Sequence, residues 1–181
     1  IWYRMQNIHN CRSSNPLRHI KQLDSRFNLL HFTNMGDFIM NDNTQYIGMQ
    51  SISLANPAYI KEYYSVVGKK EGEGPLGKYF SQIETDDMFG CSSWEEAESA
   101  LQTETVKGLL HKSNLEPHSV RYTFAGDLLG QLMATSFGLK SFNIPLFGLY
   151  GACSTMGEAI SLGAMTVSAG YADTVLSLAS S

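Results

Sequence analysis

The sequence has little cysteine, and its three cysteines lie far apart. Cys11, Cys91 and Cys153 form no C-x-x-C pair, and their number is odd. Structural zinc sites need closely spaced ligands, and disulfide frameworks need even sets of cysteine. We therefore expect no metal site, no disulfide framework and an intracellular, reducing location.

Positive charge is also scarce. The 181 residues include 13 Lys and Arg against 17 Asp and Glu, which gives a formal net charge of -4. The pI is about 5.7. Proteins that bind nucleic acid present basic surfaces to the phosphate backbone. The charge balance therefore predicts no nucleic-acid partner.

The sequence lacks both the apolar core of a signal peptide and a long apolar run of the membrane-spanning kind. The first residues mix Arg4, Asn7 and His9 with apolar side chains, and no apolar segment follows them. The least charged stretch, 144–170, contains Glu158 together with several Ser, Thr and Gly residues. A helix enclosed in a folded domain explains this stretch better than a helix in lipid.

Two parts of the chain differ in character. Residues 1–45 are polar, rich in asparagine and without sustained periodicity, so we expect a disordered or spurious extension. Met35 and Met40 are both candidate true starts within it. Residues 46–181 are long enough to bury the core of one domain.

Strands and helices alternate along residues 46–181. Strands that alternate with helices of this length predict an α/β fold with a mostly parallel, mixed sheet. The stretch from Ser154 to Ala169 is small or apolar almost all round, which predicts a buried central helix. The other expected elements are strands at 46–54, 121–125, 146–150 and 174–179 and a helix at 128–139.

One further helix has a well-marked start. Ser93 followed by Glu96 forms a capping box, and apolar residues then recur at helical spacing. We expect the charged residues of this helix, Glu98 among them, to lie mostly off its inward face. The residues expected on that face are Trp94, Ala97, Leu101, Thr105 and Leu109.

The segment 145–156 combines a short apolar run, two small residues and a cysteine. It predicts a strand–turn–helix with Cys153 at the helix start, where unpaired N–H groups stabilise a thiolate. Gly151 and Ala152 allow a sharp turn and leave the sulfur accessible. Free cysteine is also among the most often buried residue types, so packing is the alternative role for Cys153.

Three other candidates have two explanations each. The glycine loop 72–77 suggests a phosphate cradle, but Lys78 is followed by Tyr79 and not by the Ser or Thr of a P-loop, so we expect no nucleotide cofactor. Asp127 follows a strand and suits either a helix cap or a ligand site. Glu158 either reaches solvent or faces a ligand cavity.

Several short segments also occur in a recognisable order. Together they resemble the stage V sporulation protein AD family, from about Tyr46 to the last residue. They are 68–80 (GKKEGEGPLGKYF), 93–98 (SWEEAE), 125–131 (AGDLLGQ) and 147–156 (FGLYGACSTM), extended by 171–175 and 177–181.

The resemblance implies a thiolase-like fold built from two similar βαβαβαββ halves. We expect 46–181 to be the N-terminal βαβαβ half-fold, truncated before the second half, from which the catalytic histidines of thiolases largely come. In thiolases and ketoacyl synthases the matching cysteine accepts the acyl group, and it falls on Cys153. A thiolase- or ketoacyl-synthase-type acyltransferase is therefore one alternative function, and a scaffold subunit that only docks partners is another.

The function that the resemblance favours is binding of dipicolinic acid for uptake into the developing spore. It implies a place at the forespore or spore inner membrane, peripheral and among the other subunits of a membrane transport complex. Without its second half the domain should expose an apolar face, so we also expect a homodimer or looser association. The expected ligand-binding residues are Cys153, Ser154, Thr155, Asp127 and Glu158.

Overall fold

The computed structural model describes residues 45–128 and 130–181. The expected extension at residues 1–45 therefore lies outside the described residues, apart from Gln45. The main sheet has three parallel strands in the order β6-β5-β7. An α/β fold with parallel strands is thereby confirmed. The strands are β5 (Tyr122–Gly126), β6 (Leu146–Gly148) and β7 (Val175–Ala179).

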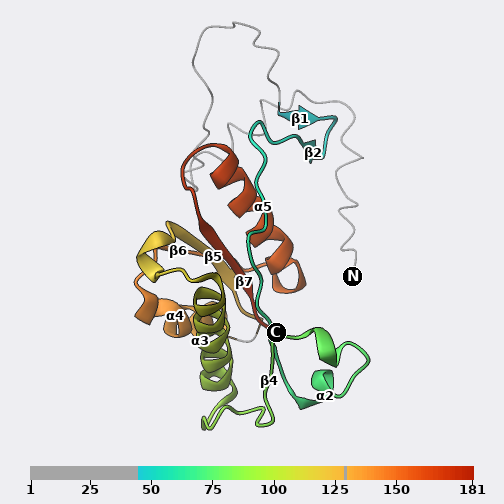
Figure 1. The fold of residues 1–181 in the computed structure, drawn as a ribbon, viewed down its shortest axis with the longest axis vertical. Coiled ribbons are helices and arrows are strands. Elements are labelled where there is room, and N and C mark those ends of the chain that lie inside the picture. The colour runs from blue at the N-terminus through green and yellow to red at the C-terminus, as the bar shows by residue number, and fades with distance from the viewer. Residues whose placement is uncertain (1–44, 129) are drawn as a thin grey trace, which may run out of the picture. The chain divides into compact units, whose positions relative to one another are not determined.

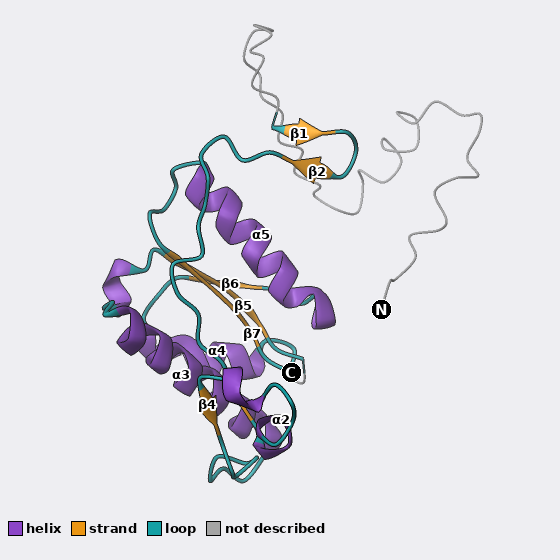
Figure 2. Cartoon of the chain, turned by 45° about the vertical axis from the view of Figure 1, so that its right-hand side comes forward, coloured by secondary structure: helices purple, strands orange, loops and turns teal. Residues whose placement is uncertain are grey.

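Helices cover both faces of this sheet. Figures 1 and 2 show α3 and α4 on one side of the strands and α5 on the other. The chain therefore alternates β5-α4-β6-α5-β7 with successive helices on opposite faces, as in doubly wound folds. The helices are α3 (Trp94–Ser113), α4 (Met133–Leu139) and α5 (Thr155–Ser168).

Alternate residues of the strands point into two different layers. Ala125, Leu176 and Leu178 enter the core together with Val106 and Leu110 of α3. On the opposite face the Ser177 hydroxyl donates to the Ala159 carbonyl of α5 at 2.9 Å. The strand register, with Phe124 opposite Phe147 and Ser177, fixes which side chains share each layer.

Helix α3 begins where the capping box predicts. The Ser93 hydroxyl accepts from the Glu96 N–H at 3.3 Å, and the Glu96 carboxylate accepts from the N–H and hydroxyl of Ser92. The expected inward face is confirmed at Ala97 and Thr105, which are buried. It is wrong at Trp94, which is 60% exposed, and it left out Glu98 and Gln102, which are buried. Hydrogen bonds to Thr135 of α4 and to Ser180, directly after β7, pair part of each of these two polar side chains, which hydropathy alone would place outside.

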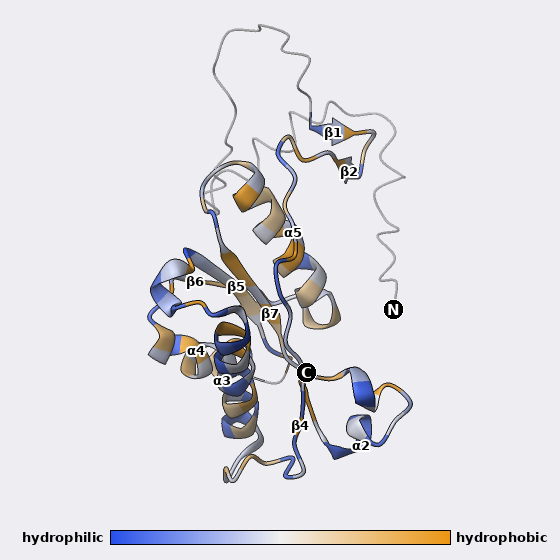
Figure 3. Cartoon of the chain, viewed as in Figure 1, coloured by the Kyte–Doolittle hydropathy of each residue, from blue (hydrophilic) through white to orange (hydrophobic). Residues whose placement is uncertain are grey.

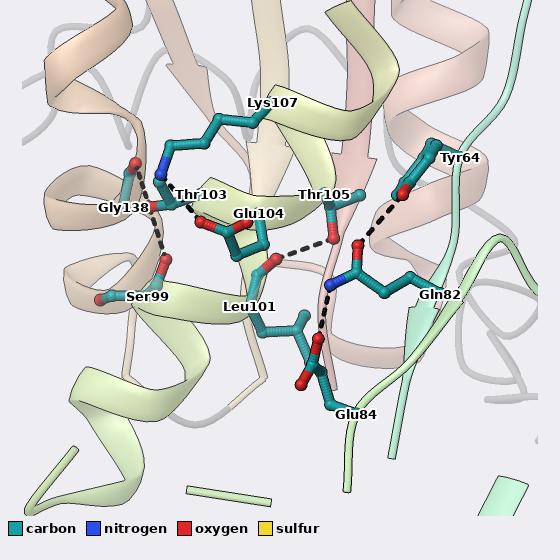
Figure 4. A network of polar contacts seen from close by, with 10 residues as sticks. All are labelled: Tyr64, Gln82, Glu84, Ser99, Leu101, Thr103, Glu104, Thr105, Lys107 and Gly138. Atoms are coloured by element: carbon teal, nitrogen blue, oxygen red, sulfur yellow. Dashed lines mark hydrogen bonds and ion pairs between the residues drawn. The ribbon is translucent and has the colours of Figure 1, made fainter. Parts of the chain in front are cut away.

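Close backbone contact holds α3 against α4. The Ser99 hydroxyl donates to the Ala134 carbonyl at 2.9 Å. The Thr103 hydroxyl donates to the Gly138 carbonyl at 2.8 Å, as Figure 4 shows. A Cβ on Gly138 would lie 2.7 Å from the Ser99 carbonyl oxygen. The absence of a side chain at Gly138 therefore sets how near the two helices approach.

Two expected elements are wrong in their extent. The run 46–54 is a hairpin of β1 (Tyr46–Ile47) and β2 (Ser51–Ile52), because Gly48 turns the chain at φ +63°. Helix α4 starts at Met133 and not at 128, because Gln131 and Leu132 have positive φ angles of 47° and 72°.

The expectation that the helix following Cys153 is enclosed on most sides is also wrong for the described chain. Figure 3 shows apolar colours along β5, β7 and much of α5. The small residues Ala159 and Gly163 face the sheet, whereas Met156, Ile160 and Met165 are 45%, 45% and 41% exposed. Only the small-residue face of α5 is buried.

The glycine loop belongs to a small parallel pair of strands. A Cβ on Gly77 would overlap the Gly72 carbonyl, and one on Gly72 would overlap the Ile83 side chain. These glycines therefore serve close packing of the loop on itself. The elements here are β3 (Val66–Val67), α2 (Lys69–Gly72), a 3-10 turn (Gly77–Tyr79) and β4 (Gln82–Ile83).

Short 3-10 turns complete the described chain. Within residues 45–128 and 130–181, no helix is both long and apolar enough to cross a membrane. The turns are η2 (Pro117–Ser119), η3 (Lys140–Phe142) and η4 (Ala152–Ser154).

Candidate functional site

Cys153 lies in the turn between β6 and α5. It is the middle residue of η4, two residues before the first residue of α5, and it is exposed. The expected strand–turn–helix is therefore confirmed. Because β5, β6 and β7 are parallel, their carboxyl ends share one edge of the sheet, where α/β proteins commonly bind ligands.

The backbone of this turn is tightly constrained. Ala152 has a φ of +49°, an unfavourable conformation for a residue with a Cβ. The Ser154 N–H donates to the Gly151 carbonyl at 3.0 Å, and the Gly151 N–H donates to the Thr155 hydroxyl at 3.3 Å. A Cβ on Gly126 would overlap the Leu149 carbonyl, so the end of β5 is pressed against the turn. These contacts hold the position of Cys153.

An open hollow of about 590 Å³ adjoins the cysteine. All its lining residues come from η4 and α5, at the three- and four-residue spacing of one helix face. Three of the six lining residues were expected from the sequence, and helical periodicity from Ser154 and Glu158 predicts the other three. The lining residues are Cys153, Ser154, Gly157, Glu158, Ser161 and Leu162.

Ser154 and Glu158 interact directly at the rim of this hollow. The Ser154 hydroxyl lies within hydrogen-bond distance of the Glu158 carboxylate and also 2.8 Å from the Gly151 carbonyl oxygen. Because the hydroxyl has one hydrogen, it can donate to only one of these two acceptors at a time. Glu158 is exposed to solvent and also lines the hollow, so its expected role toward a ligand stays a prediction.

Thr155 is not brought to the hollow. It is 1% exposed, and its hydroxyl accepts from Gly151 beneath the turn. The side chain therefore supports the turn and does not line the hollow.

Asp127 also lies outside the lining, and it is 1% exposed. Its carboxylate accepts from the N–H groups of Gly130, Leu132 and Thr135 and, at 2.6 Å, from the Thr135 hydroxyl. The N-cap residue of α4 is Leu132, so Asp127 is not itself the cap, but its carboxylate accepts from the Thr135 N–H in the first turn of that helix. Burial pushes the pKa of Asp127 upward, but the hydrogen bonds, those from Thr135 foremost, outweigh it and hold the pKa below its ordinary value.

The site can offer an exposed thiol, hydroxyl groups and one apolar side chain, Leu162. Its lining contains one carboxylate, Glu158, and no basic residue. Within the described chain, no group of three or more His, Cys, Asp and Glu side chains is arranged to hold a metal ion. The arrangement suits either covalent chemistry at sulfur or hydrogen bonding of a small polar ligand.

Comparisons with known proteins place this chain in a family. A sequence model described as Stage V sporulation protein AD matches residues 48–181. Stage V sporulation protein AD of Bacillus subtilis (strain 168) is 33% identical over 136 residues, which cover 74% of this chain and 40% of that relative. The chain thus spans less than half the length of the relative. It belongs to the stage V sporulation protein AD family.

Proposed function

We propose that this chain serves sporulation by contributing to a binding site for dipicolinic acid, a small aromatic dicarboxylate taken up into the developing spore. The observation that carries the proposal is the hollow beside Cys153, located next to the carboxyl edge of the sheet in a chain of this family. The ligand itself follows from the family resemblance, and the hollow is where we propose that it binds.

The lining suits one end of such a ligand better than the other. The hydroxyls of Ser154 and Ser161 can donate to a carboxylate, and Leu162 offers apolar contact to a ring. Glu158 repels a dianion, and the lining supplies no positive charge to offset it. We therefore expect the second carboxylate to need groups from outside this hollow, so that the chain alone binds weakly or not at all.

The location and partners in the proposal follow the same reasoning. We place the protein peripherally at the forespore or spore inner membrane, in contact with other subunits of a transport complex. The exposed apolar side chains of α5 are candidates for contacts with another protein or with a second copy of the chain.

Calorimetry with dipicolinate tests the proposal. The chain would be compared with a fusion that adds the remaining part of the Bacillus subtilis relative, because this chain covers 40% of that protein. We expect saturable binding by the fusion, and its loss when Cys153→Trp fills the hollow. Cys153→Ala, which leaves the hollow open, should retain binding. Full affinity in the isolated chain, or unchanged binding in the Cys153→Trp fusion, would place the site elsewhere.

A second candidate function is acyl transfer, which the exposure of the Cys153 thiol favours. In that step the thiolate would attack the carbonyl of an acyl thioester, forming a new acyl–sulfur bond and releasing the donor thiol. Incubation of the fusion with an acyl thioester, followed by intact mass measurement, separates the two functions. A stable acyl adduct that is lost in Cys153→Ala favours the enzyme, and an unmodified protein favours binding alone.

A further inference from the structure

A buried polar cluster lies away from the hollow, where α3 meets α4 and the ends of β5 and β7. Gln102 is fully buried at its centre, and Glu98 is 7% exposed one helical turn earlier. We call these two residues, with Asp127, Thr135 and Ser180, the Gln102 cluster. All its members are linked by hydrogen bonds, and none belongs to the candidate site lining.

The direction of each hydrogen bond in the cluster can be assigned. The Gln102 amide donates to the hydroxyls of Thr135 at 3.0 Å and Ser180 at 2.7 Å. Thr135 then donates to Asp127, and Ser180 donates to Glu98 at 2.6 Å. The Leu128 N–H also donates to Glu98, at 3.3 Å. Both carboxylates therefore act only as acceptors.

Two oxygens of the cluster lack a donor. Glu98 Oε2 and Gln102 Oε1 are buried and have no hydrogen-bond partner among the described residues. Their head groups are adjacent, because Glu98 Oε1 and Gln102 Nε2 both contact the same Ser180 hydroxyl. An unpaired buried acceptor costs about 1–3 kcal/mol, and more if it is charged. Neither oxygen therefore has a partner that offsets this cost among the described residues.

The cluster also lacks a positive charge. No Lys, Arg or His of the described chain lies within ion-pair distance of Glu98 or Asp127. Asp127 at least receives four hydrogen bonds, whereas one oxygen of Glu98 receives none. Buried carboxylates are normally paired with a cation. A neutral water would satisfy the two oxygens but would leave the charge of Glu98 uncompensated.

We propose that Glu98 Oε2 and Gln102 Oε1 bind a monovalent cation such as potassium or ammonium. Oxygen ligands from a carboxylate and an amide suit a hard cation and do not suit zinc or copper. One carboxylate oxygen provides too little negative charge for a calcium-type site. The cation would tie α3 to the loop after β5 and to the end of β7.

Thermal unfolding of the unaltered chain at constant ionic strength tests this inference. Chloride salts of potassium, sodium and ammonium would be compared with N-methylglucamine chloride, whose cation is too large for a buried site. We expect at least one small cation to raise the unfolding midpoint by about 2–4 °C, saturating with its concentration. An equal midpoint in all salts would overturn the proposal. An internal water would then be the remaining partner for the two oxygens.

Matched variants locate the effect on α3. Glu98→Gln and Gln102→Leu should abolish the cation dependence, whereas Glu95→Gln, an exposed carboxylate on the same helix, should keep it. Persistence of the dependence in the first two variants would place the cation elsewhere. If they fail to fold, crystals of the unaltered chain grown with rubidium decide the question. An anomalous peak between Glu98 Oε2 and Gln102 Oε1 supports the site, and its absence there overturns it.

Discussion

Asp127 organises the loop between β5 and α4 through a single carboxylate. The loop has unfavourable positive φ angles at Gln131 and Leu132, and the hydrogen bonds to Asp127 compensate for them. Such a residue is difficult to distinguish from a ligand-binding carboxylate by sequence, because both functions place an acidic residue at a strand end. Only the position of its donors in three dimensions separates the two.

Replacing Asp127 by Asn should therefore destabilise the fold. The variant loses charge-assisted acceptors for buried N–H groups, and we expect its free energy of unfolding at pH 7 to fall by about 1–3 kcal/mol. Urea denaturation measures this difference. Asp173→Asn, at an exposed position, should change little. A loss as small as that of the control would contradict the structural role of Asp127.

The acid dependence of stability gives a second measure of Asp127. Its pKa is lowered in the folded chain from an ordinary value of 3.8. Its stabilising contribution is therefore complete above that value and declines as the pH falls through the lower, folded-state pKa. Below about pH 4 we expect the unfolding free energy of the unaltered chain to fall more steeply than that of Asp127→Asn. Parallel curves would show that Asp127 does not contribute this dependence.

Cysteine alkylation tests the exposure of the turn. Cys153 is exposed, whereas Cys91 is half-buried and its sulfur lies 3.7 Å from the Phe89 carbonyl oxygen. In a Cys11→Ser background, iodoacetamide should label Cys153 before Cys91, as followed by peptide mass spectrometry. Faster labelling of Cys91 would contradict the exposed position of Cys153.

At the scale of elements, the start of a helix could be predicted where the interactions that fix it lie close together in the sequence. The start of α3 was predictable because Ser93 and Glu96 lie within one turn of each other. The start of α4 was not, because the bond from Thr135 to Asp127 spans eight residues. The burial of Gln102 depends on Ser180, 78 residues away. No pattern of apolar residues within a helix reports such a partner.

The candidate site was half predictable for the same reason. Cys153 and Ser154 could be predicted because they follow the small residues of the turn. Glu158 could be predicted because it is an isolated charge in an apolar segment. Gly157, Ser161 and Leu162 carry no signal of their own and are found only from the helical spacing that follows Ser154 and Glu158. Thr155 was predicted beside Cys153, but the helix turns its side chain beneath the loop toward Gly151.

Two glycines in helices should respond oppositely to alanine. Gly138→Ala places a Cβ 2.7 Å from a backbone oxygen of α3, so we expect a loss of about 1–3 kcal/mol in unfolding free energy. The Cβ that Gly157→Ala adds would have no atom within 4 Å, so this substitution should stabilise α5 by about 0.5–1 kcal/mol through helix propensity. Urea denaturation of both variants checks this contrast. Equal effects would contradict the close packing of α3 on α4.

At the scale of the whole described chain, burial is one-sided. The layer between the sheet and α3 contains the core, whereas large apolar side chains of α5 remain exposed. Within the described residues, β6 and β7 each pair on one side only, with β5. The apolar character of α5 was predictable from its sequence. What lies against it was not, because hydropathy does not distinguish a face covered by the same chain from one covered by another molecule.

This surface predicts that the chain associates in solution. Exposed apolar residues of α5 and open strand edges both favour contacts with another copy. Light scattering at micromolar concentration should therefore report a mass above 20.0 kDa, the mass of one chain. A double substitution of Ile160→Glu and Met165→Glu puts charges on the exposed face of α5 and should shift the mass toward the monomer. His111→Glu, on the exposed surface of α3, should leave association unchanged. A stable monomer of the unaltered chain, or equal association of the double variant, would show that the α5 face is not the contact.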